Sequence, residues 1–160
     1  SRLVTEREAA VRRMEQSEQK FRRLTALSAD WYWEQDEQYR FVESRGATDE
    51  RGGLTPSQHV GQTRWELPGT RPVGTTWDAH RADLDARRPF RDLLLSRPDP
   101  EGRMRYVSVS GEPVYDADAR FRGYHGVASD ITTKVEAEAA LRSAKEAADA
   151  ANAEIGRAHV

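Results

Sequence analysis

Residues 89–132 read PFRDLLLSRPDPEGRMRYVSVSGEPVYDADARFRGYHGVASDIT, and this stretch decides the fold. Two short polar clusters, PDPEG at 98–102 and DADA at 116–119, separate three runs that are rich in strand-forming residues. We therefore expect three consecutive antiparallel strands, at 91–97, 103–115 and 120–129, joined by two tight turns.

Two shorter strands are expected upstream, at 31–36 and 39–44, with the polar turn 36–38 between them. From 46 to 74, frequent glycine and proline interrupt every regular period, so only short helical turns are expected there. The five strands predict an α+β fold: a five-stranded antiparallel sheet with helices on one face. That face would otherwise expose the apolar run at 93–95.

A clearer helix is expected from 75 or 76 to 87, just before the last three strands. One face of this helix carries residues at helical spacing, namely Trp77, His80, Arg81 and Leu84. Pro89 prevents the helix from continuing, because proline cannot donate the next backbone hydrogen bond.

Both ends of the chain show helical patterns with charged residues on most faces. In residues 1–27 the apolar stripe has heptad-like spacing: Val4, Val11, Met14, Phe21 and Leu24. After 132 the spacing is a regular four and three: Ala137, Leu141, Ala144, Ala148, Ala151 and Ile155. Such spacing is typical of coiled coils. We predict a homodimer whose seam includes Val11, Met14, Phe21, Leu141, Ala144 and Ala148. The alternatives are an N-terminal helix lying on its own domain and a solvated C-terminal helix.

Composition excludes several classes of function. The formal net charge is −2, so no basic surplus favours nucleic acid or direct contact with an anionic membrane. The chain has no cysteine, which excludes disulfides, thiolate metal sites and photochemistry through a cysteine–flavin adduct. No phosphate loop, GxSxG motif or zinc-ligand spacing is present, so we expect neither catalysis nor a metal site. No apolar run approaches a membrane span, and we expect a cytoplasmic location, whether or not the parent protein is membrane-anchored.

Several short motifs occur in a characteristic order. They are Ser17-Glu18-x-x-Phe21, Asp30-Trp31-x-Trp33-Glu34, Gly61-Gln62-Thr63, Trp65-Glu66, Pro89-Phe90-Arg91-Asp92, Pro100-x-Gly102, Val107-Ser108-Val109-Ser110-Gly111-x-Pro113, Phe121-x-Gly123-Tyr124-x-Gly126 and Asp130-Ile131-Thr132. None is specific alone, but in this order they make residues 17–145 resemble a PAS domain.

The resemblance implies an input or relay module of a bacterial signalling protein. Residues 1–27 are then an N-terminal amphipathic linker helix, residues 28–131 the PAS sensory domain and residues 132–160 a C-terminal signalling helix. In PAS domains the triplet matching Asp130, Ile131 and Thr132 joins the last strand to the output helix. A carboxylate and a hydroxyl there can pair with free N–H groups of the first helical turn. Residues 154–160 break the alanine-rich pattern and are assigned no function. The chain is expected to be a segment of a longer protein.

PAS domains often hold a small cavity between sheet and helices. Its walls here are predicted to come from Trp33, Phe41, Trp65, Trp77, His80, Leu93, Tyr106, Ser108 and Tyr124. Two alternatives stay open: these side chains surround a small organic ligand, or they fill the core and the domain relays a signal without a ligand. No cofactor is required, and neither haem, through His80, nor flavin is expected.

Three hypotheses for function follow, in order. The first is a sensory or relay module that dimerises and transmits a conformational change to an output domain in the same chain. That output is a histidine kinase of a two-component system or, alternatively, a diguanylate cyclase. The second hypothesis is a small-molecule-binding domain. The third, an enzyme, has no motif to support it.

Overall fold

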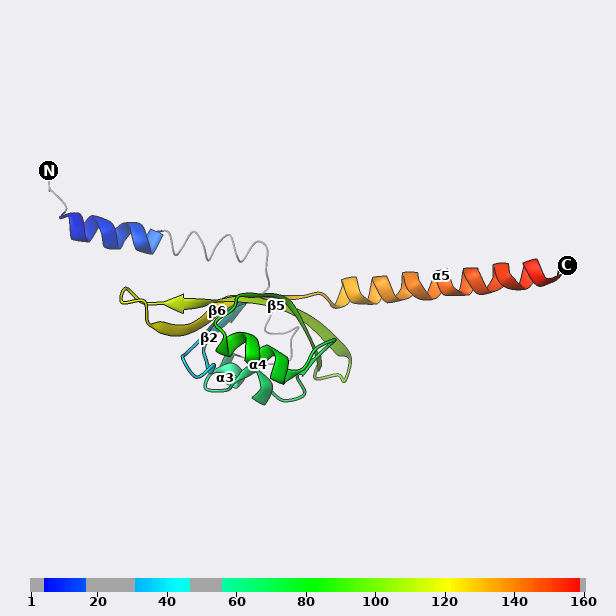
Figure 1. The fold of residues 1–160 in the computed structure, drawn as a ribbon, viewed down its shortest axis with the longest axis horizontal. Coiled ribbons are helices and arrows are strands. Elements are labelled where there is room, and N and C mark those ends of the chain that lie inside the picture. Colours follow the sequence, from blue (N-terminus) through cyan, green and yellow to red (C-terminus); the bar gives the residue numbers. More distant parts are fainter. Residues whose placement is uncertain (1–4, 17–30, 47–55, 159–160) are drawn as a thin grey trace. The chain divides into compact units, whose positions relative to one another are not determined.

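The computed structural model describes residues 5–16, 31–46 and 56–158 (Figure 1). The chain divides after Asp130 into two compact units, Ser1–Asp130 and Ile131–Val160, which are described separately below. Residues 6–16 are helical, as predicted. Predictions for Val4, Phe21, Leu24 and the motif at 17–21 lie outside the described residues.

The sheet contains the five predicted strands. They are β1 (Trp31–Gln35), β2 (Phe41–Gly46), β4 (Phe90–Pro98), β5 (Met104–Tyr115) and β6 (Phe121–Asp130). A two-residue edge strand, β3 (Arg71–Pro72), extends the sheet to the order β2-β1-β6-β5-β4-β3, and every neighbouring pair is antiparallel. The sequence did not predict β3, because two residues show no alternation and proline is uncommon within strands.

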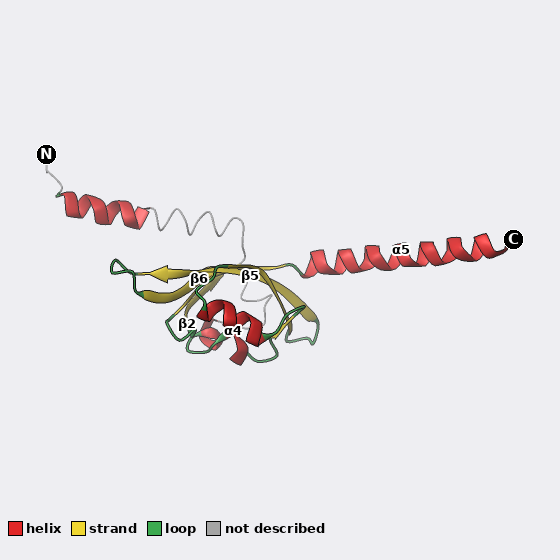
Figure 2. Cartoon of the chain, viewed as in Figure 1, coloured by secondary structure: helices red, strands yellow, loops and turns green. Residues whose placement is uncertain are grey.

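Three helical elements lie on one side of the sheet (Figure 2): α3 (Pro56–His59), the 3-10 turn η1 (Arg64–Glu66) and α4 (Trp77–Asp85). The predicted start of α4 is confirmed, because the Thr76 hydroxyl accepts a hydrogen bond from the Ala79 amide at 3.1 Å. α4 ends at Asp85, two residues before the predicted end at Arg87. Arg87 itself adopts a left-handed conformation with φ of 57°.

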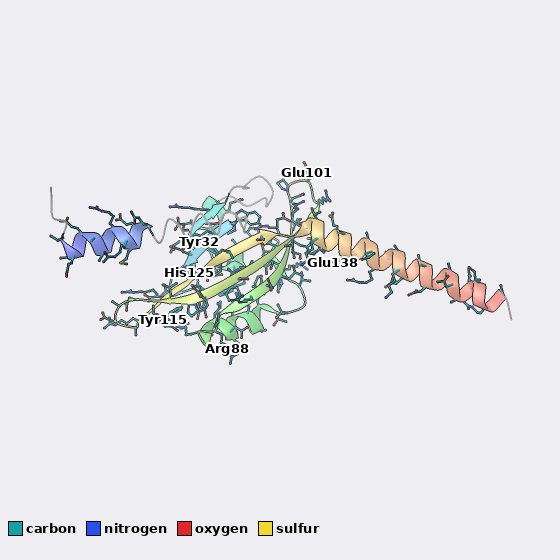
Figure 3. The ribbon with its side chains drawn as sticks, turned by 90° about the horizontal axis from the view of Figure 1, so that it is seen from above. Tyr32, Arg88, Glu101, Tyr115, His125 and Glu138 are labelled. Carbon is teal, nitrogen blue, oxygen red and sulfur yellow. The ribbon has the colours of Figure 1, made fainter. Side chains whose placement is uncertain are left out.

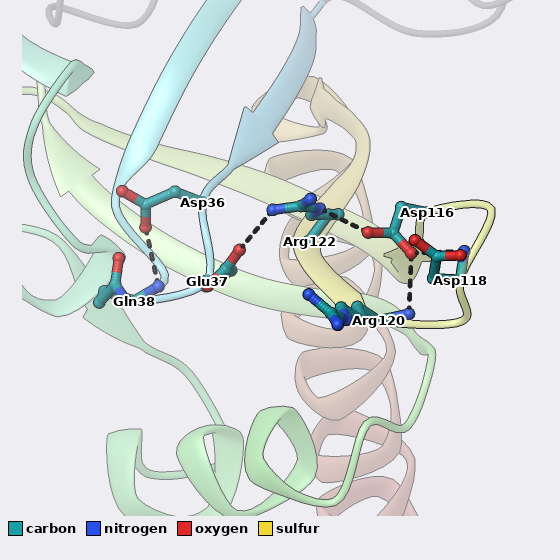
Figure 4. A network of polar contacts seen from close by, with 7 residues as sticks. All are labelled: Asp36, Glu37, Gln38, Asp116, Asp118, Arg120 and Arg122. Atoms are coloured by element: carbon teal, nitrogen blue, oxygen red, sulfur yellow. Dashed lines mark hydrogen bonds and ion pairs between the residues drawn. The ribbon is translucent and has the colours of Figure 1, made fainter.

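The three hairpin turns share one construction. In each, an aspartate side chain accepts hydrogen bonds from the amides two and four residues later, and the residue before the final arginine has positive φ. The sequences are Asp36-Glu37-Gln38-Tyr39-Arg40, Asp99-Pro100-Glu101-Gly102-Arg103 and Asp116-Ala117-Asp118-Ala119-Arg120. Figure 4 shows two of them, linked by Arg122, which pairs with Glu37 at 3.2 Å and Asp116 at 3.0 Å. This repeated turn sets the register of three strand pairs.

The face of the sheet toward the helices carries the core. Trp33 lies across this face because Gly111 and Gly126 leave room for its indole ring. A Cβ at Gly126 would come 2.7 Å from that ring, and one at Gly111 would come 2.6 Å from it. Val107 and Val109 face the core, whereas Tyr106 and Ser108 alternate onto the opposite face, which we call the outer face.

The second unit is one helix, α5 (Thr132–Ala158). Its start agrees with the predicted position, and its first backbone hydrogen bond runs from the Val135 amide to the Ile131 carbonyl at 2.9 Å. Leu141 is 73% exposed and Ile155 56%, so the apolar positions of the predicted seam are uncovered in the single chain. Among the described helices, none combines the length and apolar character that a bilayer crossing requires.

Candidate functional site

A cavity of about 60 Å³ lies between the inner face of the sheet and the segment that contains α3 and η1. On this scale one water needs about 10–15 Å³, so the cavity has room for roughly four to six waters or a small molecule. Its lining is mostly apolar, with a few polar groups. The lining residues are Trp31, Trp33, Phe41, Ser44, His59, Arg64, Leu67, Thr70, Leu95, Arg97, Val107, Val109 and Ala128.

Arg64 is the most unusual residue of this lining. Its side chain is 2% exposed, and its guanidinium carbon lies 4.6 Å from the Trp33 ring, 5.2 Å from Phe41 and 5.5 Å from Phe90. Aromatic faces within about 6 Å stabilise a cation, most strongly away from water. Burial still lowers the pKa of Arg64 to about 9, so the group remains charged at neutral pH.

His80 supports Arg64 from α4. The Arg64 Nη1 group lies 3.0 Å from His80 Nε2, and both side chains are buried. Burial, and then the charge of Arg64, lowers the pKa of His80 to about 3. The imidazole is therefore neutral at physiological pH and its Nε2 accepts the hydrogen bond that Arg64 donates. His80 holds the guanidinium in place and does not itself line the cavity.

The turn that carries Arg64 is fixed by its neighbours. The Glu66 carboxylate accepts hydrogen bonds from the Thr63 amide at 3.1 Å and from the Thr63 hydroxyl at 2.7 Å. These bonds lower the pKa of Glu66, with the hydroxyl as the main cause. Because Thr63 directly precedes η1, the bonds set the direction in which Arg64 enters the cavity.

Arg97 and Thr70 face the cavity from the edge of the sheet. Arg97 is 9% exposed and Thr70 7%. The Arg97 Nε and the Thr70 Oγ1 are fully buried and have no hydrogen-bond partner among the described residues. Burial lowers the pKa of Arg97, and the negative charge of Asp130 raises it partway back. Two buried donors of this kind are rare in native structures and need an explanation.

The predicted wall residues are only partly brought together. Trp33 and Phe41 line the cavity, whereas the other seven predicted residues do not. Tyr106 and Ser108 lie on the outer face, which corrects the choice of face made from the sequence. Tyr124 instead anchors the end of α4, because its hydroxyl donates to the Arg88 carbonyl at 2.9 Å. The remaining four pack around the core: Trp65 against Tyr39, Trp77 against His80, His80 against Phe90, and Leu93 at the margin.

Neither Arg64 nor Arg97 was predicted from the sequence to line the cavity. Arg97 alternates with Leu93 and Leu95 along β4, so the period of two could have placed it on the core face. Nothing comparable marks Arg64, which lies in a region without a regular period. Arginine side chains are mostly exposed in proteins, and that expectation was wrong for both residues.

The outer face carries polar side chains, among them Tyr32 and His125, which are labelled in Figure 3. His125 of β6 bonds Glu112 of β5 at 3.0 Å, and its ring meets the edge of Tyr32 from β1. Within the described part of the chain, no group of three potential metal ligands comes together. The cavity is the candidate site because it lies against the core and is lined by two buried donors without partners among the described residues.

The predicted signal junction lies at the boundary between the two units. Asp130 ends β6, and its side chain is 4% exposed. Arg105 on β5 donates two hydrogen bonds to one Asp130 oxygen, from Nη2 at 2.7 Å and from Nε at 3.1 Å. Thr132, the first residue of α5, is 1% exposed. Asp130, two residues before the first residue of α5, is thus held by a largely buried ion pair.

No protein-family model and no curated protein sequence matches the chain. Solved structures do resemble it. A light-oxygen-voltage domain studied with a flavin analogue has a TM-score of 0.58 and 14% identity, over 78% of this chain and 93% of that one. An RNA-binding light-oxygen-voltage receptor has a TM-score of 0.60 and 16% identity, and the match covers 79% of this chain and 36% of that one. The light-state LOV domain of the blue-light photoreceptor Aureochrome1 has a TM-score of 0.53 and 15% identity, and the match covers 69% of this chain and 88% of that one. Light-oxygen-voltage domains have the PAS fold, and this chain has a PAS-like fold.

Proposed function

We propose that this chain is a sensory or relay module that dimerises and transmits a conformational change through α5 to an output domain in the same protein. The observation that supports it most is the Arg105–Asp130 ion pair. The pair fixes the last residue of β6, and α5 begins two residues later in the chain. A change in the sheet that alters this pair therefore acts on the backbone at the start of α5.

The pair is connected to the cavity through the sheet. Asp130 is opposite Val107 in the β5–β6 register, and Val107 lines the cavity. Arg105 is opposite Arg97 in the β4–β5 register, and Arg97 also lines the cavity. If the contents of the cavity change, a shift of Val107, or of Arg97 and Arg105, is enough to alter the contacts of Asp130. Two arrangements that differ by a few kcal/mol are sufficient for a switch.

The output domain we propose is a histidine kinase, with a diguanylate cyclase as the alternative. We propose no catalytic activity for this segment, no nucleic-acid partner and no direct membrane contact, since its net charge is −2 and no catalytic motif is present. The second candidate function, a small-molecule-binding domain, is favoured by the cavity and its unpartnered donors.

A flavin, the group named for one structural neighbour, does not fit this chain. The cavity measures about 60 Å³. Pockets for drug-sized ligands measure about 300–1,000 Å³. The chain also lacks a cysteine that could form an adduct. The proposed signal is therefore not carried by flavin photochemistry.

Dimerisation is tested by two identical changes on one helix. Ala148 lies on the predicted seam and Ala153 on the opposite side, and both are exposed helical alanines. We expect Ala148→Glu to weaken a dimer seen by light scattering, since it places two like charges in the seam, while Ala153→Glu leaves the dimer unchanged. A wild-type chain that stays monomeric at millimolar concentration would contradict this part of the proposal.

A further inference from the structure

We propose that the cavity binds a small organic carboxylate, which Arg97 and Thr70 contact directly and to which Arg64 contributes positive charge. The inference rests on the proposed sensory function, for which it names the class of ligand. It follows from three independent features of the cavity: its charge, its unpartnered donors and its apolar wall.

The first feature is a positive charge that no residue of the lining neutralises. The lining contains two guanidinium groups, Arg64 and Arg97, and no carboxylate among its described residues. Arg64 forms no ion pair with any residue that the structure describes; rings and a neutral imidazole surround it. A buried charge is costly unless it is paired. An anion in the cavity would remove that cost, and a cation would increase it.

The second feature is a pair of donors placed side by side. Arg71 is opposite Ser96 in the β3–β4 register, so one residue further Thr70 comes opposite Arg97. Both side chains are more than nine-tenths buried and line the cavity, and the Arg97 Nε and Thr70 Oγ1 have no partner in the described chain. One carboxylate group can accept from both donors, because its two oxygens offer several lone pairs.

The third feature separates an organic from an inorganic anion. Most of the remaining wall is apolar, and on the sheet side it includes Leu95, Val107, Val109 and Ala128. Hydrocarbon against these side chains is favourable, whereas the free oxygens of a phosphate would lose their hydration there. The cavity volume of about 60 Å³ suits a molecule of few heavy atoms. A short aliphatic monocarboxylate meets all three conditions.

Such a ligand would act on the signal junction. Arg97 is the cavity residue on which the charge of Asp130 acts. A carboxylate bound at Arg97 places a second negative charge near that guanidinium and weakens its attraction for Asp130. Asp130 then depends more on Arg105, and its position at the end of β6 can change. Binding in the cavity thereby affects Asp130, which lies two residues before the first residue of α5.

The test titrates the 160-residue chain with butyrate, with the neutral isostere butyramide and with inorganic phosphate. Binding is followed by calorimetry and by the NMR signal of the Trp33 indole N–H, which donates to the Val127 carbonyl at 3.2 Å beside the cavity. We expect butyrate to bind at least about tenfold more tightly than either other probe, the factor that a charge-assisted hydrogen bond provides. Equal binding of butyramide, tighter binding of phosphate, or no binding of butyrate at 50 mM (roughly the weakest affinity such a small ligand would show) overturns the proposal.

Three variants assign the binding to the named groups. Arg97→Gln should weaken butyrate binding at least about tenfold, while Arg71→Gln, an exposed arginine on the neighbouring strand, should not. Thr70→Val should weaken binding several-fold without lowering the melting temperature, because the hydroxyl it removes has no partner. If Arg97→Gln does not fold, the Thr70→Val result decides. Wild-type affinity in a folded Arg97→Gln variant or in Thr70→Val overturns the proposal.

The ligand class and the proposed function can fail separately. A chain that dimerises through α5 but binds none of the three probes overturns the carboxylate and leaves the relay function intact. A monomeric chain that binds butyrate through Arg97 supports the carboxylate and removes the dimeric relay.

Discussion

Arg105 donates both of its hydrogen bonds to a single oxygen of Asp130, at 2.7 and 3.1 Å, with the carboxylate side chain only 4% exposed. This ion pair lies at the last residue of the sheet. Its burial distinguishes it from the surface pairs of the molecule, such as Arg88–Asp83 on the α4 side, in which the side chains are 68% and 44% exposed. The two pairs should therefore differ in their effect on stability.

We expect Asp130→Asn to lower the free energy of unfolding by about 2 kcal/mol, between the values for exposed and buried pairs, because it leaves Arg105, whose side chain is 18% exposed, without a counter-ion. The matched change Asp83→Asn should cost less than about 0.5 kcal/mol, since water already solvates both groups of that pair. Urea unfolding of both variants measures the difference. Equal effects would show that the Arg105–Asp130 pair is not buried in solution.

The stability of the domain should depend on pH through His80. Its folded-state pKa is about 3, against 6.5 for a free histidine. Between these values the unfolded state binds the extra proton, so stability is lost as the pH falls below 6.5. From pH 7 to pH 5 the loss from this group is about 2 kcal/mol.

Two histidine variants test whether His80 causes this loss of stability at low pH. His80→Gln keeps an acceptor for Arg64 but cannot titrate, so it should remove about 2 kcal/mol from the loss of stability between pH 7 and pH 5. His125→Gln, on the outer face, should keep the His80 contribution. A His80→Gln variant with the wild-type pH dependence of unfolding would show that His80 is not buried in neutral form.

Because the hairpin turns share one geometry, we predict opposite effects on stability for two reverse substitutions. Ala119 has φ of 58° and Gly102 has φ of 83°, and each occupies the fourth position of its turn (Figure 4 shows Asp116, Asp118 and Arg120 of the first turn). A left-handed conformation costs a residue with a Cβ about 1 kcal/mol or more. Ala119→Gly should therefore stabilise the domain and Gly102→Ala should destabilise it, each by about 1 kcal/mol. Thermal unfolding of the two variants checks the signs, and effects in the same direction would refute the shared geometry.

Much of the fold could be predicted from local sequence. Strand-forming residues between two polar turns predicted β5, and the threonine at 76 marked the start of α4, because turn residues and helix caps act within a few residues. β3 was missed because its two residues pair only through tertiary contact. The candidate site was predicted less well. On β5 both faces carry large side chains, so alternation could not show whether Tyr106 or Val107 faces the helices. Arg64 gave no signal, because its burial depends on rings brought in from three distant strands.

The central claim, that a change in the cavity reaches α5 through Asp130, is tested most directly by hydrogen exchange at the Val135 amide. This amide forms the first backbone hydrogen bond of α5, to the Ile131 carbonyl. We expect Arg97→Gln to change its exchange rate at least about fivefold, the lower range of measured couplings, and Arg71→Gln to leave it unchanged. In an Asp130→Asn background the Arg97→Gln effect should disappear. The same change in both backgrounds, or no change at Val135 at all, would contradict the account.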